Sequence, residues 1–312
     1  MNSEPSIRPV NRTTVRAKTW PLQAVRAGIV AVEAGSPALA ARLVEHLMFR
    51  TQRRAVPARE RAVLEGARRF SVRSIHGKLA AWRWGGGPVV LLVHGWNGRG
   101  SQLGALAPPL VRSGFEVVTF DAPGHGASEG TRSSLIHFAD GIDAVLDAVR
   151  EPFRPIHAIV AHSMGGAATT YAMSRFRRAP TTHLERELRE GELPGRRFLF
   201  VAPPVDVGDF VRAATTMLGV GAETQTSVRR LIESHAGISL QELHAPTAAR
   251  GLHAPLLVLH DEGDREVPLA CGQQLAGAWP GAQIETTRGL GHHRILWDPA
   301  VVERIAAFVG AD

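Results

Sequence analysis

The chain has 312 residues, of which 44% are hydrophobic, and carries a net charge of +7. This length allows one large α/β domain with an insertion, or two small domains. The single cysteine, Cys271, excludes an intrachain disulfide and is interpreted as a small core residue of a helix. No stretch predicts a transmembrane span or an ordinary signal peptide, so we expect a cytoplasmic protein.

The positive charge is concentrated near the N-terminus. Residues 1–73 hold 13 arginines and one lysine against five glutamates, which gives this segment +9 and leaves −2 for the remainder. A polybasic segment can contact anionic lipid or nucleic acid. These arginines are dispersed among alanines and valines, so we interpret them as solvated helix surface and expect no nucleic-acid partner. Contact of the N-terminal helices with a membrane surface is the alternative.

Residues 1–68 are predicted to form a basic helical extension. Residues 1–19 are polar and aperiodic, which predicts disorder. Helical spacing then begins with Leu22, Val25, Ile29 and Val32. Ser36 followed by Pro37 predicts the start of a second helix. Its apolar face is expected to consist of Leu39, Leu43 and Leu47, and both helices are expected to dock on the rest of the protein.

Residues 69–312 alternate between strand and helix patterns. A hairpin is predicted over residues 69–84. A continuous apolar run, typical of a strand buried on both faces, covers 88–93. Further strands are predicted over 115–120, the run entering Ser163, 197–202, 255–260 and 284–287. Helices are predicted over 101–113, 134–150, the stretch after Ser163, and 299–309. This alternation predicts a doubly wound, mostly parallel sheet, in which ligands bind beyond the carboxyl ends of the strands.

Two segments interrupt the alternation. Residues 180–195 are polar and are expected to form a loop or short helix. Residues 205–250 contain apolar helical spacings but no strand pattern. An insertion between two strands of the sheet is well placed to act as a lid over a site at the strand ends.

The stretch around Ser163 has the pattern of a nucleophile elbow. A β-branched strand leads into a serine flanked by small residues, Ala161 and Gly165, and an alanine-rich helix follows. Small neighbours are needed because strand and helix approach closely at the strained apex. The usual pattern is G-x-S-x-G, and Ala161 replaces its first glycine. A helix N-cap is the structural alternative for the serine.

Five blocks, all in the same order, make the chain resemble a serine hydrolase of the α/β-hydrolase fold, a family of esterases and lipases, over about residues 70–310. The blocks are His94-Gly95-Trp96, Asp121 to Ser128, Ala161 to Gly166, Asp264 to Pro268, and Gly291-His292. The resemblance implies the order Ser163, Asp264 and His292 for a catalytic triad. It does not cover residues 1–60.

A serine hydroxyl needs a neighbouring base, and the resemblance assigns that role to His292, with the adjacent His293 as the alternative. The acid that orients the histidine is implied to be Asp264, with Asp261 and then Asp206 as alternatives. The backbone N–H groups of Trp96 and Met164 are implied to form the oxyanion hole. We expect His94 to be a structural hydrogen-bonding residue, Asp121 and His125 to shape a turn, and His162 to point away from the site.

The predicted function is hydrolysis of carboxylic esters through an acyl-enzyme, with short to medium acyl chains as substrates. The alternative is a non-hydrolytic protein of the same fold, such as an acyltransferase, a perhydrolase or a binding protein, because an insertion of roughly 45 residues can exclude water. The scattered histidines and the absence of P-loop, dinucleotide and metalloprotease motifs predict neither a metal nor a cofactor. The oligomeric state is not determined by the sequence.

Overall fold

The computed structural model describes residues 20–150, 156–178 and 197–311. The disorder expected for residues 1–19 and the loop or short helix expected for residues 180–195 therefore lie outside the described residues. Within the described ranges, every helix is too short or too polar to cross a membrane.

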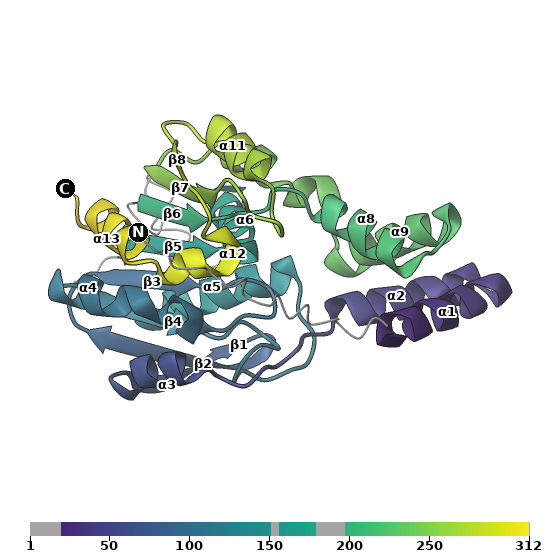
Figure 1. The fold of residues 1–312 in the computed structure, drawn as a ribbon, viewed down its shortest axis with the longest axis horizontal. Coiled ribbons are helices and arrows are strands. Elements are labelled where there is room, and N and C mark those ends of the chain that lie inside the picture. Colours follow the sequence, from purple (N-terminus) through teal and green to yellow (C-terminus); the bar gives the residue numbers. More distant parts are fainter. Residues whose placement is uncertain (1–19, 151–155, 179–196, 312) are drawn as a thin grey trace, which may run out of the picture.

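One eight-stranded sheet forms the centre of the molecule, with the strand order β1-β2-β4-β3-β5-β6-β7-β8 (Figure 1). The strands are β1 (Arg68–Ser74), β2 (Gly77–Gly85), β3 (Val89–Val93), β4 (Glu116–Phe120), β5 (Ile156–His162), β6 (Arg197–Val201), β7 (Leu256–Asp261) and β8 (Gln283–Thr287). The hairpin of β1 and β2 is antiparallel and β2 joins β4 in antiparallel pairing, whereas all later pairings are parallel. The predicted doubly wound, mostly parallel sheet is confirmed.

Helices cover both faces of this sheet. One face carries α3 (Ala58–Glu65), the 3₁₀ segment η1 (Gly100–Leu106), α4 (Ala107–Arg112) and α13 (Pro299–Gly310). The other carries α5 (Leu135–Val149), α6 (Met164–Arg178), α10 (Ala245–Ala249) and α11 (Leu269–Ala278). Alternate residues of β3 serve the two cores, since Leu91 packs in one and Leu92 in the other, and both are fully buried. Two-sided burial explains why the strand is continuously apolar.

The single helix predicted over residues 101–113 is divided in the structure into η1 and α4. Pro108 and Pro109 open α4. Because proline has no backbone N–H, neither residue can donate the bond that would continue a regular α-helix from the preceding turn. The apolar spacing predicted the buried face correctly but not this break.

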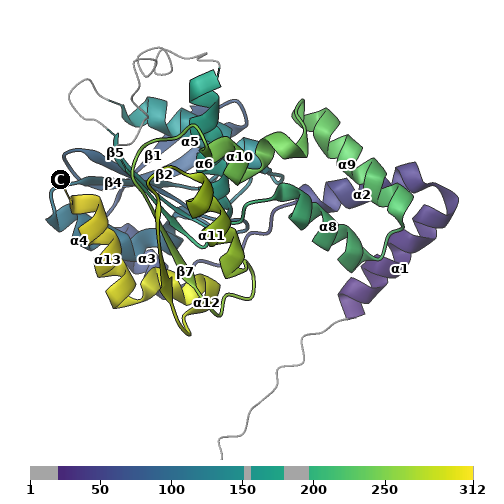
Figure 2. The same cartoon turned by 90° about the horizontal axis from the view of Figure 1, so that it is seen from above.

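The two N-terminal helices pack with the insertion that follows β6. Helices α1 (Trp20–Gly35), α2 (Pro37–Phe49), α8 (Val207–Leu218) and α9 (Ala222–Ala236) form one lobe beside the sheet (Figures 1 and 2). We call this four-helix lobe the cap. Val44 of α2 and Val228 of α9 are fully buried within it. Glu33 of α1 accepts a hydrogen bond of 2.8 Å from the N–H of Gly221, at the start of α9.

The buried face of α2 differs from the predicted one. Ser36 caps the helix as expected, accepting a bond from the N–H of Leu39. However, Leu39 is 56% exposed, and the buried side chains include Val44 and Met48. The stripe of leucines is displaced from the contact because α9, which the sequence pattern could not reveal as the partner, lies against the neighbouring face of α2.

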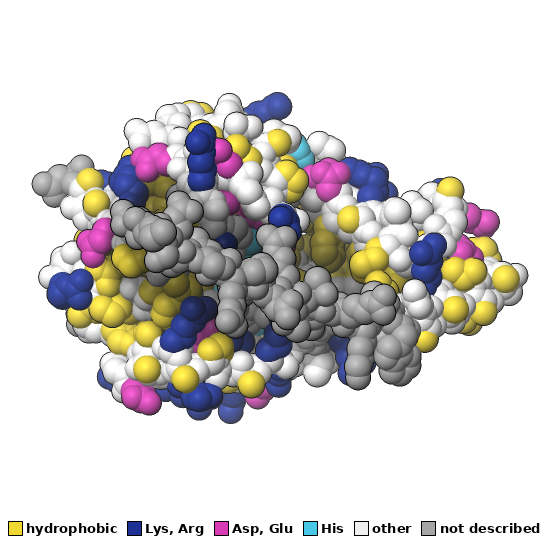
Figure 3. Space-filling model, viewed as in Figure 1, with side chains coloured by type: hydrophobic (Ala, Val, Ile, Leu, Met, Phe, Trp, Pro, Cys, Tyr) yellow, Lys and Arg dark blue, Asp and Glu magenta, His cyan; other side chains and the backbone are white. Residues whose placement is uncertain are grey.

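Several apolar side chains remain on the surface of the cap, where hydrophobic groups are visible in Figure 3. Val25, Phe210 and Met217 are 43%, 50% and 54% exposed. With Leu47 and Met48 they line an open apolar groove of about 440 Å³ between α1, α2 and α8.

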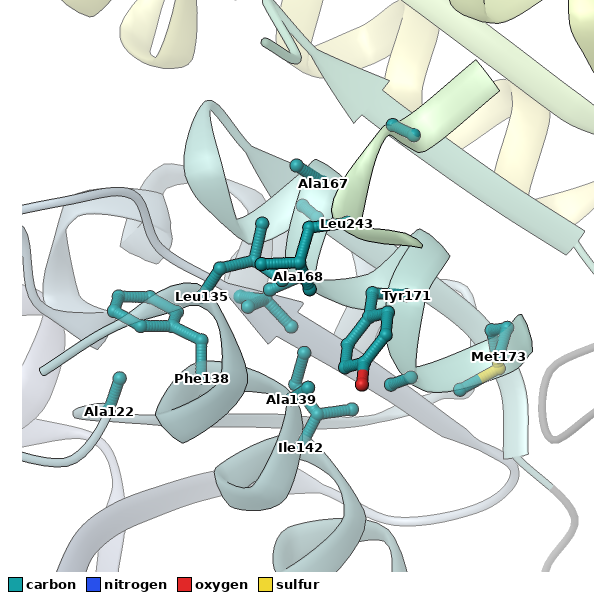
Figure 4. Packing of buried hydrophobic residues seen from close by; sticks show 14 of the residues in the cluster. Ala122, Leu135, Phe138, Ala139, Ile142, Ala167, Ala168, Tyr171, Met173 and Leu243 are labelled. Carbon is teal, nitrogen blue, oxygen red and sulfur yellow. The ribbon is translucent and has the colours of Figure 1, made fainter. Parts of the chain in front are cut away.

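The insertion returns to the core before β7. Leu243, in the 3₁₀ turn η3 (Leu240–Leu243), packs near Leu135 of α5 and near Ala167 and Ala168 of α6 (Figure 4). The N–H of Ala245 then donates to the carbonyl of Val205 over 2.9 Å, which closes the base of the insertion.

Candidate active site

Ser163 lies between the end of β5 and the start of α6, with φ = 53°. This left-handed backbone is uncommon for a residue with a side chain and is typical of strained positions at functional sites. The N–H of Ser163 donates to the carbonyl of Val201 over 2.8 Å, so the apex is anchored to the neighbouring strand. Ser163 keeps accessible surface, whereas Ala161 and Gly165 are buried. The geometry of a nucleophile elbow is therefore present.

Two glycines make room for this turn. A side chain on Gly165 would place its Cβ 2.5 Å from the carbonyl oxygen of His94, and one on Gly95 would lie 2.8 Å from Cβ of Ser163. Neither separation is sterically possible without movement. Ala161, in contrast, is fully buried and pairs with Val93 in the sheet, so the structure accommodates a methyl group where the usual pattern has a glycine.

Asp264 and His292 are brought together from the ends of two different strands. Asp264 follows β7, and His292 lies in the short helix α12 (Gly291–Arg294) after β8. The Nδ1–H of His292 donates to Oδ2 of Asp264 over 2.7 Å. This bond fixes the imidazole tautomer and leaves Nε2 on the opposite edge of the ring.

The environment of Asp264 keeps its carboxylate ionised. Its side chain has no exposed surface, and its Oδ1 accepts bonds from the N–H groups of Glu266 and Val267 at 2.8 and 3.0 Å. Burial raises the pKa of Asp264, but the bonds from Val267, His292 and Glu266 outweigh it, so the pKa lies below its ordinary value. An ionised acid can orient the ring and stabilise an imidazolium.

The alternative residues occupy other places. The His293 side chain is 62% exposed and lies 2.9 Å from a carboxylate oxygen of Glu266. Asp206 caps α8 by accepting from the N–H of Gly208.

Asp261 supports the loop that carries His292. Its Oδ2 accepts bonds of 2.9 Å from the hydroxyl of Thr287 and from the N–H of Leu290, and its Oδ1 accepts from Gly263 N–H. Burial raises the pKa of Asp261, but these hydrogen bonds lower it by more. Asp261 therefore holds the chain between β8 and α12 rather than contacting the imidazole.

His162 does not point away from the site, contrary to the expectation from the sequence. Its Nε2–H donates to the backbone carbonyl of His292 over 2.9 Å, and the two rings are 4.6 Å apart between centroids. Burial and the neighbouring His292 lower the pKa of His162 to about 3, so this ring is neutral. Sequence reasoning missed this contact because alternation along a strand gives the face of a side chain but not what the following loop brings to it.

The loop after β3 approaches the elbow as predicted. His94 is buried, donates from Nδ1 to the carbonyl of Gly95 over 2.7 Å, and accepts at Nε2 from the N–H of Ala122. Burial and the neighbouring His125 are the main causes that lower the pKa of His94 well below its usual range, so it is neutral and structural, as expected. Trp96 and Met164 keep accessible surface beside these buried neighbours.

Asp121 and His125 shape the second loop, after β4, as expected. Asp121 accepts bonds from the N–H groups of Gly100 and Ala127, and His125 accepts one from the N–H of Asn97 over 3.1 Å. Burial raises the pKa of Asp121 to about 6 and lowers that of His125 to about 4. The two loops are thus tied to each other behind the candidate site.

A cavity of about 310 Å³ opens between the cap and the N-terminus of α5. Its apolar wall includes Phe49, Leu135, Val207, Ile232 and Leu243. Among the residues that the structure describes, no group of three or more His, Cys, Asp or Glu side chains is arranged to hold a metal ion.

Comparison with known proteins agrees with this fold. Residues 90–305 match the model of the alpha/beta hydrolase family. That span covers more than half of the chain, so the protein belongs to this family. An uncharacterized protein of Mycobacterium tuberculosis is 26% identical over 293 residues, covering 74% of this chain and 79% of its own length.

Solved structures with the same fold include an esterase, a putative lipase and a protein solved with ferulic acid bound. Est1E from Butyrivibrio proteoclasticus, solved with ferulic acid bound, has a TM-score of 0.58 at 19% identity, covering 77% of this chain and 96% of that one. A putative lipase from Acinetobacter baumannii has a TM-score of 0.58 at 16% identity, covering 82% of this chain and 97% of that one. An esterase from Exiguobacterium antarcticum has a TM-score of 0.57 at 16% identity, covering 77% of this chain and 99% of that one. At these identities the likeness shows the fold alone.

Proposed function

We propose that the protein hydrolyses carboxylic esters, with Ser163 as nucleophile, His292 as general base and Asp264 as the acid that orients it. The observation that carries the proposal is the buried hydrogen bond of 2.7 Å between Asp264 and His292. The ring of His292 also contacts that of His162, which directly precedes the accessible Ser163 with its φ of 53°. A serine hydroxyl is a poor nucleophile alone and requires such a base.

In the first half of the reaction, Oγ of Ser163 attacks the ester carbonyl carbon while Nε2 of His292 takes the hydroxyl proton. The resulting oxyanion accepts hydrogen bonds from the backbone N–H groups of Trp96 and Met164. When the intermediate collapses, the bond to the alcohol oxygen breaks and His292 returns the proton to that oxygen. Asp264 stays ionised throughout and stabilises the transient imidazolium.

In the second half, water replaces the alcohol. His292 removes a proton from the water as it attacks the acyl-enzyme, and the same two N–H groups hold the second oxyanion. Collapse releases the carboxylic acid, and the proton on His292 returns to Oγ of Ser163. Loss of one oxyanion donor typically lowers kcat by about 10²–10³.

We place an acyl group of short to medium length in the cavity beside Leu135 and Leu243. The lining of this cavity also includes Glu45 and Arg132, and it contains none of the candidate catalytic residues. Leu243 packs near Ala167 and Ala168, which belong to the first turns of α6 after Ser163 (Figure 4). The apolar wall of this cavity is thus next to the helix that follows Ser163, and apolar walls are typical of pockets that bind small ligands.

A fluorophosphonate probe and a series of p-nitrophenyl esters, from acetyl to dodecanoyl, test the proposal. We expect covalent labelling at Ser163, located by peptide mass spectrometry, and hydrolysis that is greatest for the shorter esters. Ser163→Ala should abolish both, whereas Ser113→Ala, at an exposed serine after α4, should abolish neither. A folded protein that is not labelled and cleaves no ester would refute the proposal. Product formation that requires an added alcohol or amine would instead indicate an acyltransferase.

A further inference from the structure

The segment that joins the cap to the core lies along the loop that carries Trp96. We call residues 50–61 the strap; they include the start of α3. The N–H of Gln52 in the strap donates to Oδ1 of Asn97 over 2.8 Å. Asn97 directly follows Trp96 and has φ = 52°, within a turn closed by the 3.0 Å bond from Gly98 N–H to the carbonyl of Gly95. The strap therefore contacts the residue of this turn that has a positive φ.

A second contact holds the other side of the same turn. Glu60 accepts bonds from Nε and Nη2 of Arg99 at 2.7 and 3.1 Å and from the hydroxyl of Ser101 at 2.7 Å. Glu60, Arg99 and Ser101 are 3%, 8% and 2% exposed. A forked, buried ion pair of this kind is geometrically specific, so it fixes the position of Arg99 relative to α3.

The strap also binds the neighbouring loop after β4. Thr51 donates from its hydroxyl to the carbonyl of Gly124 over 2.7 Å, and its N–H donates to Thr131. The guanidinium of Arg53 donates to the carbonyl of Gly130 over 2.7 Å. Because His125 in that loop accepts the N–H of Asn97, the strap and the two loops form a closed set of hydrogen bonds.

We propose that the strap positions the oxyanion-hole N–H of Trp96, with Gln52 and Glu60 as positioning residues that act through Asn97 and Arg99. This inference rests on the proposed function of the site. The strap precedes residue 90, where the match to the family begins, so the proposed role belongs to the extension of this chain. Its physical basis is that a backbone donor stabilises an oxyanion only if it is already oriented before the charge develops.

Two variants remove the same hydrogen bond from opposite ends. Gln52→Pro deletes the N–H donor, and Asn97→Gly deletes the acceptor while tolerating positive φ. Gln52→Ala is the matched control, because the exposed side chain is lost but the N–H is kept. We expect each of the first two variants to lower kcat for an ester about tenfold with KM nearly unchanged, and Gln52→Ala to behave as wild type.

The double variant and a stability control separate positioning from general destabilisation. If both substitutions act through one bond, the double variant should lose no more than either alone, since their effects are not additive. Ile305→Val, at a fully buried position in α13, should lower the melting temperature without lowering kcat. For Glu60, the conservative Glu60→Gln should retain more activity than Glu60→Ala.

Hydrogen exchange provides a measurement that does not depend on activity. Peptides covering residues 95–101 should exchange faster in Gln52→Pro and Asn97→Gly than in wild type or Gln52→Ala. Unchanged exchange in these peptides, or wild-type kcat in both variants, would overturn the role of the strap. A wild-type protein that never labels at Ser163 would count against the proposed function, and the exchange rates would still decide whether the strap holds the loop.

Discussion

The Nε2–H of His162 donates a hydrogen bond to the backbone carbonyl of His292 over 2.9 Å. The ring of His162 is buried, and its centroid lies 4.6 Å from that of the His292 ring. His162, the residue before the candidate nucleophile, thus bonds to the backbone of the candidate base, while Asp264 bonds to its ring. Two independent contacts define where the imidazole lies.

We therefore expect His162→Phe to reduce ester hydrolysis. Phenylalanine retains a ring against His292 but cannot donate to its carbonyl, so the α12 loop should become less ordered and kcat should fall about tenfold. His293→Phe, the same substitution at the adjacent exposed histidine, should leave kcat within about twofold of wild type. Steady-state kinetics of both variants provides the test, and equal losses in the two would contradict a special role for His162.

The two aspartates after β7 should have separable effects. Asp264→Asn would favour the wrong tautomer of His292 and is expected to lower kcat by about 10⁴, as the loss of an orienting acid does in serine hydrolases generally. Asp261→Asn should weaken the loop bonds to Thr287 and Leu290, and should lower kcat by less than about tenfold. Circular dichroism would check that both variants fold. A larger kcat loss in Asp261→Asn would reverse the assignment of the acid.

The unfolding free energy should decrease as the pH falls below about 6.5. Burial lowers the pKa of His125 and of His137 to about 4, that of His162 to about 3, and that of His94 well below its usual range. Between these values and about 6.5 the unfolded chain binds protons that the folded protein does not, which costs about 1.4 kcal/mol per pH unit for each histidine.

Asp121 acts in the opposite direction, because its pKa is raised to about 6 and the folded state then holds a proton that the unfolded chain has lost. The net slope should be about 3–4 kcal/mol per pH unit between about pH 6 and pH 4, because the partly exposed His137 contributes less than the fully buried histidines. Urea unfolding across this range measures it. The slope should be smaller by about 1.4 kcal/mol per pH unit in His162→Phe, and a flat profile in the wild type would contradict the neutral buried histidines.

Two adjacent residues of α1 test whether the N-terminal helices are part of the folded cap. Ile29 is 1% exposed and Val30 is 41% exposed. Ile29→Ala should lower the unfolding free energy by about 2–5 kcal/mol, because it leaves a cavity against the other cap helices. Val30→Ala should change it by less than about 0.5 kcal/mol. Equal effects in chemical denaturation would indicate that α1 does not pack in solution as in the structure.

Patterns along the chain were sufficient to predict the sheet. The run from Val89 to Val93 is apolar at every position because both faces of β3 are covered, and this requirement acts on each residue separately. The small residues around Ser163 likewise reflect a local steric demand, so the turn was predictable even with Ala161 in place of glycine. Asp264 and His292 were named from motifs, and the structure places them in contact.

Contacts between distant segments were decided only by the tertiary structure. The amphipathic pattern of α2 indicated that it needs a partner, but α9 became that partner only through the folded arrangement of the insertion. The bonds from Gln52 to Asn97, from Arg99 to Glu60 and from His162 to His292 join residues whose own surroundings in the sequence give no sign of each other. Periodicity reports which face of an element is buried, whereas the identity of the group across the contact depends on how the whole chain packs.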